Sequence, residues 1–402
     1  MPFLSSFKSE KEELSLLIDI GNGSIGGALV LFGKTIPKII YNTRLPFAVV
    51  NDLDSSRLSQ GMETLLDQTL ATIMKKGFAV AFGKNKPKKL SMVFVSFSSP
   101  WFESLTKDIH ISEKKPFIIS EKFLNSILSR EEKIFHDELS KSNEDAKNDN
   151  FVMIEKSIVH TKINGYIIDE IMGKKTPVFD LTLRLAVLPK NIIDKVNSAV
   201  LKHTHITGQK VRMNTFPLVS FTVLRDLFPN VSNFIIIDIT SEITELTQVK
   251  EAIITGTISF PSGKNFIIRQ IAKVFNVPTE VAESILHLYN INKTDSSTLR
   301  TMQEVLINVE KEWSIYFEDA LAGLSPQMNL PSKVFLTADS NVAQIFIDFI
   351  KLSKADSTLN FRKIVDVVHV NGNLLSHLLQ NNPANNPDEF IGLLTLFYKK
   401  MR

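Results

Sequence analysis

One local plan occurs twice in this chain, and it constrains the fold more than any other feature. An apolar strand ends in an aspartate, a turn of small or polar residues follows, and a second β-rich run returns. The first copy spans residues 14–31, and its turn runs from Asp19 to Gly23. The second copy spans residues 234–249, and its turn follows Asp238. A repeat of this kind predicts two related domains that face one another.

A strand that delivers an aspartate into a tight turn suits a nucleotide phosphate. Backbone N–H groups in the turn can surround phosphate oxygens, and the carboxylate can hold Mg²⁺ through water. In the first turn Gly21 and Gly23 permit close backbone approach, and Ser24 offers a hydroxyl. Taken alone, the segment is more simply interpreted as an ordinary hairpin turn in which Asp19 makes an Asx hydrogen bond.

Composition and charge exclude several classes of function. The 402 residues are 44% hydrophobic, which is enough for the cores of two or more domains. The 46 basic and 43 acidic residues leave a formal charge of +3, too balanced for a protein whose main partner is a nucleic acid. The absence of cysteine excludes disulfides and thiolate zinc sites and fits a reducing cytosol.

Hydrophobic periodicity predicts the remaining elements. A helix is expected to begin at Ser55 and to stop at Gly77, and a strand is expected at residues 90–95. From about residue 97 to 205 the pattern changes to that of an inserted module. Within it we expect, in chain order, a helix over 121–139, a surface loop over 141–150, strands over 154–168 and 181–187, and a helix over 190–202.

The order and spacing of these segments resemble the actin-like ATPase superfamily, and within it the FtsA and PilM families. Residues 258–272 carry Gly263 and Asn265 where the FtsA family has glycine and asparagine, and residues 281–285 are similar to its Ala-Glu-x-Ile segment. Residues 163–189 resemble the FtsA insertion, an SHS2-type subdomain, and PilM has a comparable one. Residues 387–394 resemble the family's last helix, which returns to the first domain.

The resemblance implies an α/β fold with the two lobes of actin, Hsp70 and the sugar kinases, ribonuclease H-like, and with an inserted SHS2-type α+β subdomain. The expected divisions are 1–96 for lobe 1 with the first phosphate loop, 97–206 for the insertion, 207–230 for the return to lobe 1, 231–265 for lobe 2 with the second phosphate loop, 266–329 for its helical insertion, 330–387 for the rest of lobe 2, and 388–402 for the final helix of lobe 1.

By the same resemblance, ATP and Mg²⁺ would bind in the cleft between the lobes. The implied nucleotide-binding residues are Asp19, Gly21, Asn22, Gly23, Ser24, Asp238, Thr240, Ser241, Gly263, Asn265, Glu283 and Thr337. Asp19 and Asp238 are the implied metal ligands. No catalytic residue is predicted, because no side chain that would position an attacking water can be named, and no signature of a sugar kinase is present.

The chain departs from the family pattern around the nucleotide. Its second turn is Thr240-Ser241-Glu242 rather than glycine-rich, and Glu242 is expected to add negative charge beside the phosphates. Glu245 replaces an aspartate, Leu286 replaces a lysine near the ribose, and residues 337–340 lack the glycines on which the base would stack. Two interpretations follow: a nucleotide binder with a partial site, or a pseudo-ATPase that serves as a scaffold.

For function, the resemblance implies an FtsA-like scaffold of bacterial cell division. Such a protein is cytoplasmic, peripheral on the inner face of the membrane, self-associating, and a recruiter of a tubulin-like division protein. The alternative is a PilM-like adaptor of a type IV pilus or secretion assembly, whose inserted module grips a cytoplasmic peptide of a membrane protein. With no apolar run of about 20 residues, membrane contact is expected to be peripheral or indirect, and Phe3, Leu4 and Phe7 are candidates for a short anchor.

Overall fold

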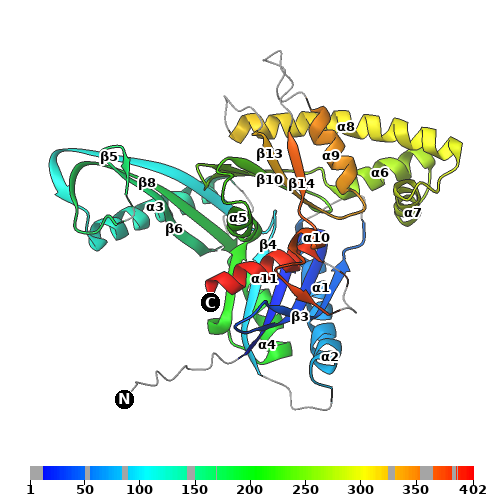
Figure 1. Ribbon diagram of the computed structural model, residues 1–402, viewed down its shortest axis with the longest axis horizontal. Helices are drawn as coiled ribbons and strands as arrows, with labels where there is room; N and C mark the ends of the chain where they lie inside the picture. Colours follow the sequence, from blue (N-terminus) through cyan, green and yellow to red (C-terminus); the bar gives the residue numbers. More distant parts are fainter. Residues whose placement is uncertain are drawn as a thin grey trace, which may run out of the picture.

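The computed structural model describes residues 12–402 except 50–54, 84–88, 143–149, 169, 325–330, 354–364, 383–385 and 387. The candidate anchor at Phe3, Leu4 and Phe7 therefore lies outside the described residues, as does most of the loop expected at 141–150. Within the described residues the strands form three sheets, one in each of two lobes and one in a module that projects to one side (Figure 1). No described helix combines the length and the apolar character that crossing a bilayer requires.

Lobe 1 is built on a six-stranded sheet in the order β15-β3-β2-β1-β4-β9. Its strands are β1 (Glu13–Ile20), β2 (Ser24–Phe32), β3 (Lys38–Pro46), β4 (Leu90–Phe97), β9 (Val211–Thr215) and β15 (Gln380–Asn381). Alternate residues of β1 face opposite sides. Leu16 and Ile18 pack with α1 (Ser55–Thr72) and α4 (Lys190–Thr204), whereas Leu17 packs with α5 (Phe216–Leu227) and α11 (Glu389–Met401).

Lobe 2 is built on a five-stranded sheet in the order β12-β11-β10-β13-β14. Its strands are β10 (Phe234–Ile239), β11 (Thr244–Lys250), β12 (Ile253–Phe260), β13 (Lys333–Ala338) and β14 (Asp366–His369). One face is covered by α6 (Lys264–Phe275), α7 (Thr279–Asn290), α8 (Ser296–Leu324) and α9 (Ala343–Leu352). The other face contributes Phe234, Ile236 and Phe335 to the same core as α5 and α11, so the two lobes share apolar packing.

The inserted module carries a four-stranded antiparallel sheet in the order β5-β8-β6-β7. Its strands are β5 (Glu103–Ile118), β6 (Phe151–Ile163), β7 (Tyr166–Ile167) and β8 (Lys175–Pro189), and α3 (Glu121–Ser142) covers one face. The single strand expected over 154–168 is a hairpin, because Gly165 has a φ of 84° and reverses the chain.

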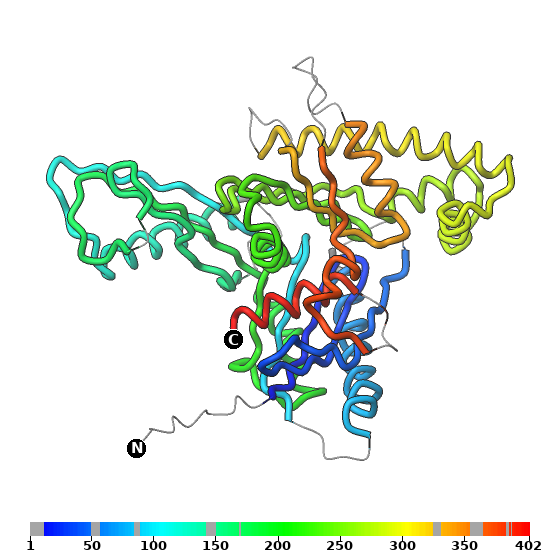
Figure 2. Tube along the Cα trace, viewed as in Figure 1, coloured from blue at the N-terminus to red at the C-terminus, as the bar shows by residue number. Residues whose placement is uncertain are grey.

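Residues near the C-terminus complete lobe 1 beside its first strand, β1, although they are distant from that strand in sequence. Figure 2 shows this for the C-terminal helix α11. The Ser15 hydroxyl donates to the Tyr398 hydroxyl at 3.3 Å, across 383 positions of sequence. The short helix α10 (Gly372–Leu375) packs beside α11 on the same face. The last helix of the chain therefore packs against the sheet that contains the first strand.

The helix expected to stop at Gly77 continues past it. A π-helical stretch (Ile73–Gly77) and α2 (Phe78–Phe82) follow α1 without a break, and the helix ends at Gly83 with a φ of 52°. A Cβ on Gly77 would lie 3.0 Å from both Leu29 and Tyr41 side chains. Gly77 therefore allows close packing of the helix on the sheet rather than ending the helix.

Candidate functional site

The two predicted turns occupy matching places in the two lobes. In lobe 1, β1 pairs antiparallel with β2 and parallel with β4; in lobe 2, β10 pairs antiparallel with β11 and parallel with β13. Asp19 and Asp238 are buried, one residue before the end of β1 and of β10. The sequence repeat therefore corresponds to a structural repeat, in which both lobes have the same strand pairing.

The two turns contact each other directly through Asn22. Its amide nitrogen donates to the Thr240 hydroxyl at 2.6 Å and to the Ser99 carbonyl at 2.7 Å. Its amide oxygen accepts from the Glu242 backbone N–H at 2.9 Å. Polar groups that could donate to a phosphate at the mouth of the cleft are therefore hydrogen-bonded to each other across the two lobes.

Gly23 of the first turn lies against Ser241 of the second. A Cβ placed on Gly23 would fall 1.7 Å from Ser241 Oγ and 1.9 Å from Ser241 Cβ. The absence of a side chain at Gly23 therefore serves contact between the lobes, because the Ser241 side chain fills the space above it. No gap for a phosphate group is left between these two residues.

The N-terminus of α6 also faces the second turn. The Lys264 backbone N–H donates to the Thr240 carbonyl at 3.0 Å, and the Asn265 N–H donates to the Ser241 carbonyl at 2.7 Å. Gly263 has no room for a Cβ, which would meet the Thr240 carbonyl oxygen at 2.4 Å. The first free N–H groups of a helix are ready anion donors, but here the protein's own carbonyls accept from these two.

Glu242 does not add charge to the cleft, so that expectation is wrong. Its carboxylate accepts two hydrogen bonds from the Arg269 guanidinium, at 2.8 and 3.1 Å, and a third from the Asn265 amide at 2.6 Å. A bidentate pair of this kind neutralises the carboxylate and fixes its direction toward α6.

Arg44 of β3 occupies the place beside Asp19. One guanidinium nitrogen contacts Asp19 Oδ2 at 3.0 Å, the Nε contacts Asp388 Oδ2 at 2.9 Å, and another nitrogen donates to the Ser24 hydroxyl at 2.9 Å. The guanidinium carbon lies 4.8 Å from the centre of the Phe390 ring. Burial raises the pKa of Asp19, and the Arg44 charge opposes that shift. Arg44 thus joins the first turn to the N-terminus of α11, which Asp388 caps.

The remaining buried carboxyl groups lie deeper between the lobes. Asp238 Oδ1 accepts from the Thr337 hydroxyl at 2.7 Å, and burial, with the Glu245 charge adding to it, raises the pKa of Asp238 well above its usual range. Burial raises the pKa of Glu245 to about 7, although a hydrogen bond from the Ser99 hydroxyl favours the charged form. One oxygen of each carboxyl group thus accepts a hydrogen bond from a hydroxyl of the protein.

A cavity of about 550 Å³ lies in front of the turns. Of the residues implied by the resemblance, its lining includes Asp19, Gly21, Gly23, Ser24, Thr240 and Ser241, and it does not include Asn22, Asp238, Gly263, Asn265, Glu283 or Thr337. Five charged lining residues were not predicted: Arg44, Lys264, Asp339, Asp388 and Glu389. Lys264 pairs with Asp339 at 3.1 Å and Glu283 at 3.0 Å, so its charge is already balanced.

The residues present do not fit Mg²⁺-ATP. Asp19 accepts from Ser96 on one oxygen and from Arg44 on the other, so a guanidinium lies where a hydrated cation would have to sit. Ser241 fills the space above Gly23, and the leading N–H groups of α6 have partners. The arrangement instead closes the lobes on each other with an internal cation and direct hydrogen bonds.

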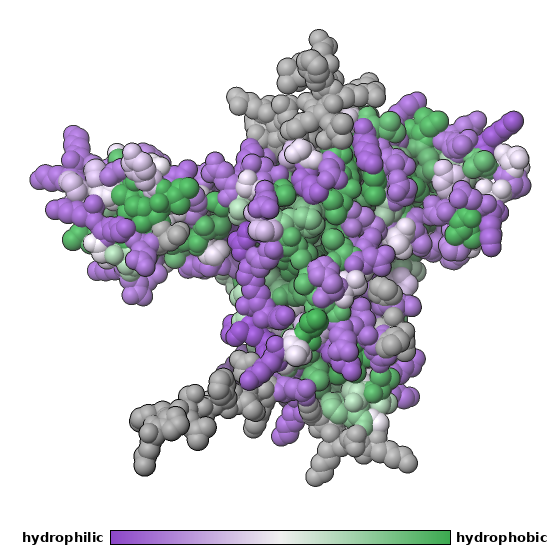
Figure 3. Space-filling view, in the orientation of Figure 1, coloured by the Kyte–Doolittle hydropathy of each residue, from purple (hydrophilic) through white to green (hydrophobic). Residues whose placement is uncertain are grey.

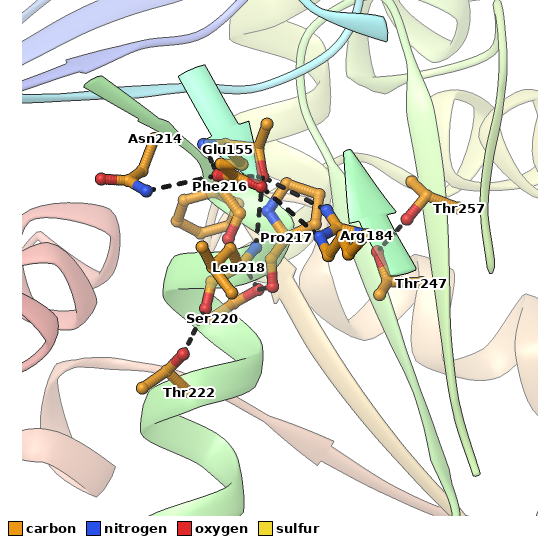
Figure 4. A network of polar contacts seen from close by, with 11 residues as sticks. Glu155, Arg184, Asn214, Phe216, Pro217, Leu218, Ser220, Thr222, Thr247 and Thr257 are labelled. Carbon is orange, nitrogen blue, oxygen red and sulfur yellow. Dashed lines mark hydrogen bonds and ion pairs between the residues drawn. The ribbon is translucent and has the colours of Figure 1, made fainter. Parts of the chain in front are cut away.

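The inserted module is joined to lobe 1 by a buried polar network, shown in Figure 4. Glu155 of β6 accepts from the Thr215 backbone N–H at 2.6 Å and from its hydroxyl at 2.9 Å, at the start of α5. Arg184 of β8 lies 3.4 Å from the other Glu155 oxygen, and both side chains are almost fully buried. A carboxylate at a helix N-terminus is favourable, so this network fixes the module's orientation.

A groove of about 860 Å³ lies beside this network, between lobe 1 and the module. Its apolar lining is Met92, Phe94, Ile154, Met213, Tyr398 and Met401. Its charged lining is Glu13, Arg212, Lys399 and Arg402, of which Glu13 and Arg402 pair with each other at 2.9 Å. Arg212 and Lys399 are exposed and form no ion pair with any residue that the structure describes. Strand β9, which ends the six-stranded sheet, contributes Arg212, Met213 and Asn214 to the lining.

Comparison with known proteins identifies the fold. No family model matches the sequence, and no curated protein matches it. Among solved structures, a PilM-PilN type IV pilus biogenesis complex matches with a TM-score of 0.57 at 14% identity, over 96% of this chain and 98% of that chain. The ethanolamine utilization protein EutJ from Carboxydothermus hydrogenoformans has a TM-score of 0.43 at 12% identity, over 96% of this chain and 90% of that chain. MreB 5 of Spiroplasma citri bound to AMPPNP has a TM-score of 0.44 at 10% identity, over 97% of each chain.

The chain therefore has the mixed α/β, actin-like ATPase fold that the sequence resemblance implied. The likeness to solved structures concerns the fold and not the activity. The narrower resemblance to FtsA and the SHS2 type of the insertion stay predictions, and so do the implied site residues and domain boundaries.

Proposed function

We propose that this chain is an actin-fold adaptor that does not hydrolyse ATP and that binds an extended segment of a protein partner in the groove between lobe 1 and the module. One observation carries the proposal. Where the resemblance would put the metal and the phosphates, Arg44 pairs with Asp19 and Ser241 lies against Gly23, whereas the groove beside the module is lined by residues of β9, the end strand of its sheet.

The lining of the groove indicates the chemistry of the partner. An unpaired strand edge recruits an extended peptide through main-chain hydrogen bonds, and apolar pockets select its side chains. The methionines of the groove, Met92, Met213 and Met401, suit apolar anchors of varied shape. Arg212 and Lys399, which lack acidic partners among the described residues, would attract acidic side chains of that segment.

The biological setting that we favour is a type IV pilus or secretion assembly. One solved structure that matches is of PilM together with PilN, and a partner of this kind would be the cytoplasmic segment of a membrane protein. The second candidate is an FtsA-like division scaffold that self-associates and recruits a tubulin-like protein; the run around Gly263 and Asn265 supports it. A fluorescent fusion separates the two settings, as envelope foci favour the first and a ring at the division plane favours the second.

We expect no saturable binding of ATP. Titration of the purified protein with a fluorescent ATP analogue and Mg²⁺ should give a linear, non-specific signal, because Arg44 pairs with Asp19 where the resemblance would put Mg²⁺, and Ser241 lies against Gly23 where it would put a phosphate. Asp19→Ala and Asp238→Ala variants, shown to be folded by circular dichroism, should give the same signal. Saturation in the parent protein that either variant abolishes would refute the proposal for the cleft.

The groove itself can be tested by site-specific photo-crosslinking in cells of the source organism. A crosslinking residue at the exposed Met401 should capture one partner, whose crosslinked segment mass spectrometry identifies. Reversing both free cations, Arg212→Glu with Lys399→Glu, should lower the yield about tenfold, since two exposed charge pairs contribute roughly 0.5–1 kcal/mol each.

The matched control reverses two exposed lysines that do not line the groove, Lys76→Glu with Lys210→Glu. It changes the net charge by the same amount and should leave the yield unchanged. Equal losses in the two double variants would mean that overall charge, and not the groove, governs capture.

A further inference from the structure

Four large apolar side chains are exposed at one end of the inserted module. They are Ile118, Tyr166, Ile167 and Met172, with exposed fractions between 56% and 76%. Ile118 ends β5, Tyr166 and Ile167 form the short edge strand β7, and Met172 lies in the turn before β8. They therefore come from three separate turns or strand ends rather than from one helix face.

Strand register brings these segments together. Ile118 pairs with Lys175, and the Gly173 N–H donates to the Ile119 carbonyl at 2.8 Å, which joins the end of β5 to the turn before β8. The Thr176 hydroxyl donates to the Asn164 side-chain oxygen at 3.1 Å, which brings in the β6–β7 turn. We call this region the distal tip: residues 113–122, 162–168 and 170–176.

The distal tip lies far from both lobes. The opposite ends of β5 and β8, where Glu103 pairs with Val187, join lobe 1, so the length of the strands separates the tip from the body. Figure 1 shows the module projecting sideways, and Figure 3 shows hydrophobic residues on this projection surrounded by hydrophilic ones. A surface placed at the tip can reach a large planar object without a clash with the lobes.

The charge around the apolar cluster is mainly positive. The tip carries six lysines, Lys114, Lys115, Lys122, Lys162, Lys174 and Lys175, against three described glutamates, Glu113, Glu121 and Glu170, which leaves a net charge of +3. Asp169, between them in sequence, lowers this to +2. None of the six lysines forms an ion pair with another residue in the described part of the chain.

We propose that the distal tip inserts into the interfacial region of an anionic lipid bilayer. A stable protein interface buries about 800 Å² of surface on each partner. A few side chains on narrow turns supply less area than this. A bilayer surface needs no complementary shape, and the transfer of each apolar side chain into it is favourable.

The Tyr166 ring suits the depth of the lipid headgroups, where amphipathic aromatic residues are enriched. The unpaired lysines are attracted to anionic lipids. This inference does not depend on the partner proposed for the groove.

Vesicle co-sedimentation tests the proposal on the full chain. We expect binding to vesicles of phosphatidylcholine mixed with phosphatidylglycerol, and at least about tenfold weaker binding to phosphatidylcholine alone. Tyr166→Ser with Ile167→Ser should weaken binding to the anionic vesicles by about tenfold or more, because two apolar side chains no longer transfer into the bilayer. Both residues are exposed, so the unfolding temperature should not change.

The matched control removes the same two residue types elsewhere. Ile315→Ser with Tyr316→Ser on α8 changes side chains that are 60% and 47% exposed, and it should leave vesicle binding unchanged. A Tyr166→Trp variant adds a reporter, since Trp101 and Trp313 are buried, and its emission should shift to the blue on mixing with anionic vesicles.

Three results would overturn the proposal. The first is that the folded parent protein does not sediment with anionic vesicles. The second is that the tip pair and the α8 pair weaken binding equally. The third is that the tip pair changes the molar mass in solution, measured by light scattering, and leaves vesicle binding intact, because the tip would then be a contact between copies of the chain.

Discussion

An Arg44→Ala variant should lose about 3–5 kcal/mol of its free energy of unfolding at neutral pH, because removing one partner of a buried ion pair leaves uncompensated charge. The Arg44 guanidinium forms ion pairs with both Asp19 and Asp388. The side chains of these two aspartates are only 2% and 8% exposed, respectively. Without it, two carboxyl groups remain buried and close together. Urea unfolding followed by circular dichroism measures the loss.

The chain offers a control in an arginine that pairs with a single, more exposed carboxylate. Arg402 pairs with Glu13 at 2.9 Å, but Glu13 is 28% exposed, so Arg402→Ala should cost less than about 1 kcal/mol. Arg44→Lys should lie between the two, because lysine keeps the charge and lacks the fork that reaches both carboxylates. If Arg44→Ala and Arg402→Ala proved equally mild, Arg44 would not act as a buried internal cation.

A methyl group on Gly23 should be the second most damaging change. Gly23→Ala places a Cβ less than 2 Å from both Ser241 Oγ and Ser241 Cβ, and overlap of this kind in a packed region costs about 1–3 kcal/mol, or more where the backbone cannot shift. Because Gly23 belongs to lobe 1 and Ser241 to lobe 2, relief requires the lobes to move apart. The same urea titration should show the loss.

Removal of the opposing side chain should restore much of that stability. In the double variant Gly23→Ala with Ser241→Gly, the Cβ and hydroxyl that clash are gone, so the two changes should be non-additive by about 1–3 kcal/mol. Gly33→Ala is the matched control, because its nearest neighbour would be Glu12 Cγ at 3.6 Å. Strict additivity of Gly23→Ala and Ser241→Gly would show that the turns do not contact each other in solution.

The parts of the fold that local pattern encodes were predictable from the sequence. The apolar strand, aspartate and polar turn at Asp19 and at Asp238 predicted two hairpins, and the structure has both with the same pairing. The helix expected over residues 190–202 is α4. Such elements depend on periodicity and on residues near one another in sequence, which a single chain displays.

The contacts that join the two lobes at the cleft could not be predicted from local sequence patterns. Arg44 is one polar residue in an ordinary strand, and its partner Asp388 is 344 positions away. Nothing in a single sequence signals that pair. The sequence showed that Thr240 and Ser241 stand where the family's second turn is glycine-rich. It did not show that these two residues would contact Asn22 and Gly23 of the other lobe.

The connectivity of lobe 1 has a consequence for the order in which the protein matures on the ribosome. The module (Glu103–Pro189) and the sheet of lobe 2 (Phe234–His369) are each continuous in sequence, so each can form as soon as it emerges. The first strands of lobe 1 emerge earliest, yet α11 and Asp388 reach them only after both other units. Since domains generally fold as units during synthesis, the lobe that is translated first is the lobe that is completed last, and its apolar face must stay shielded until then.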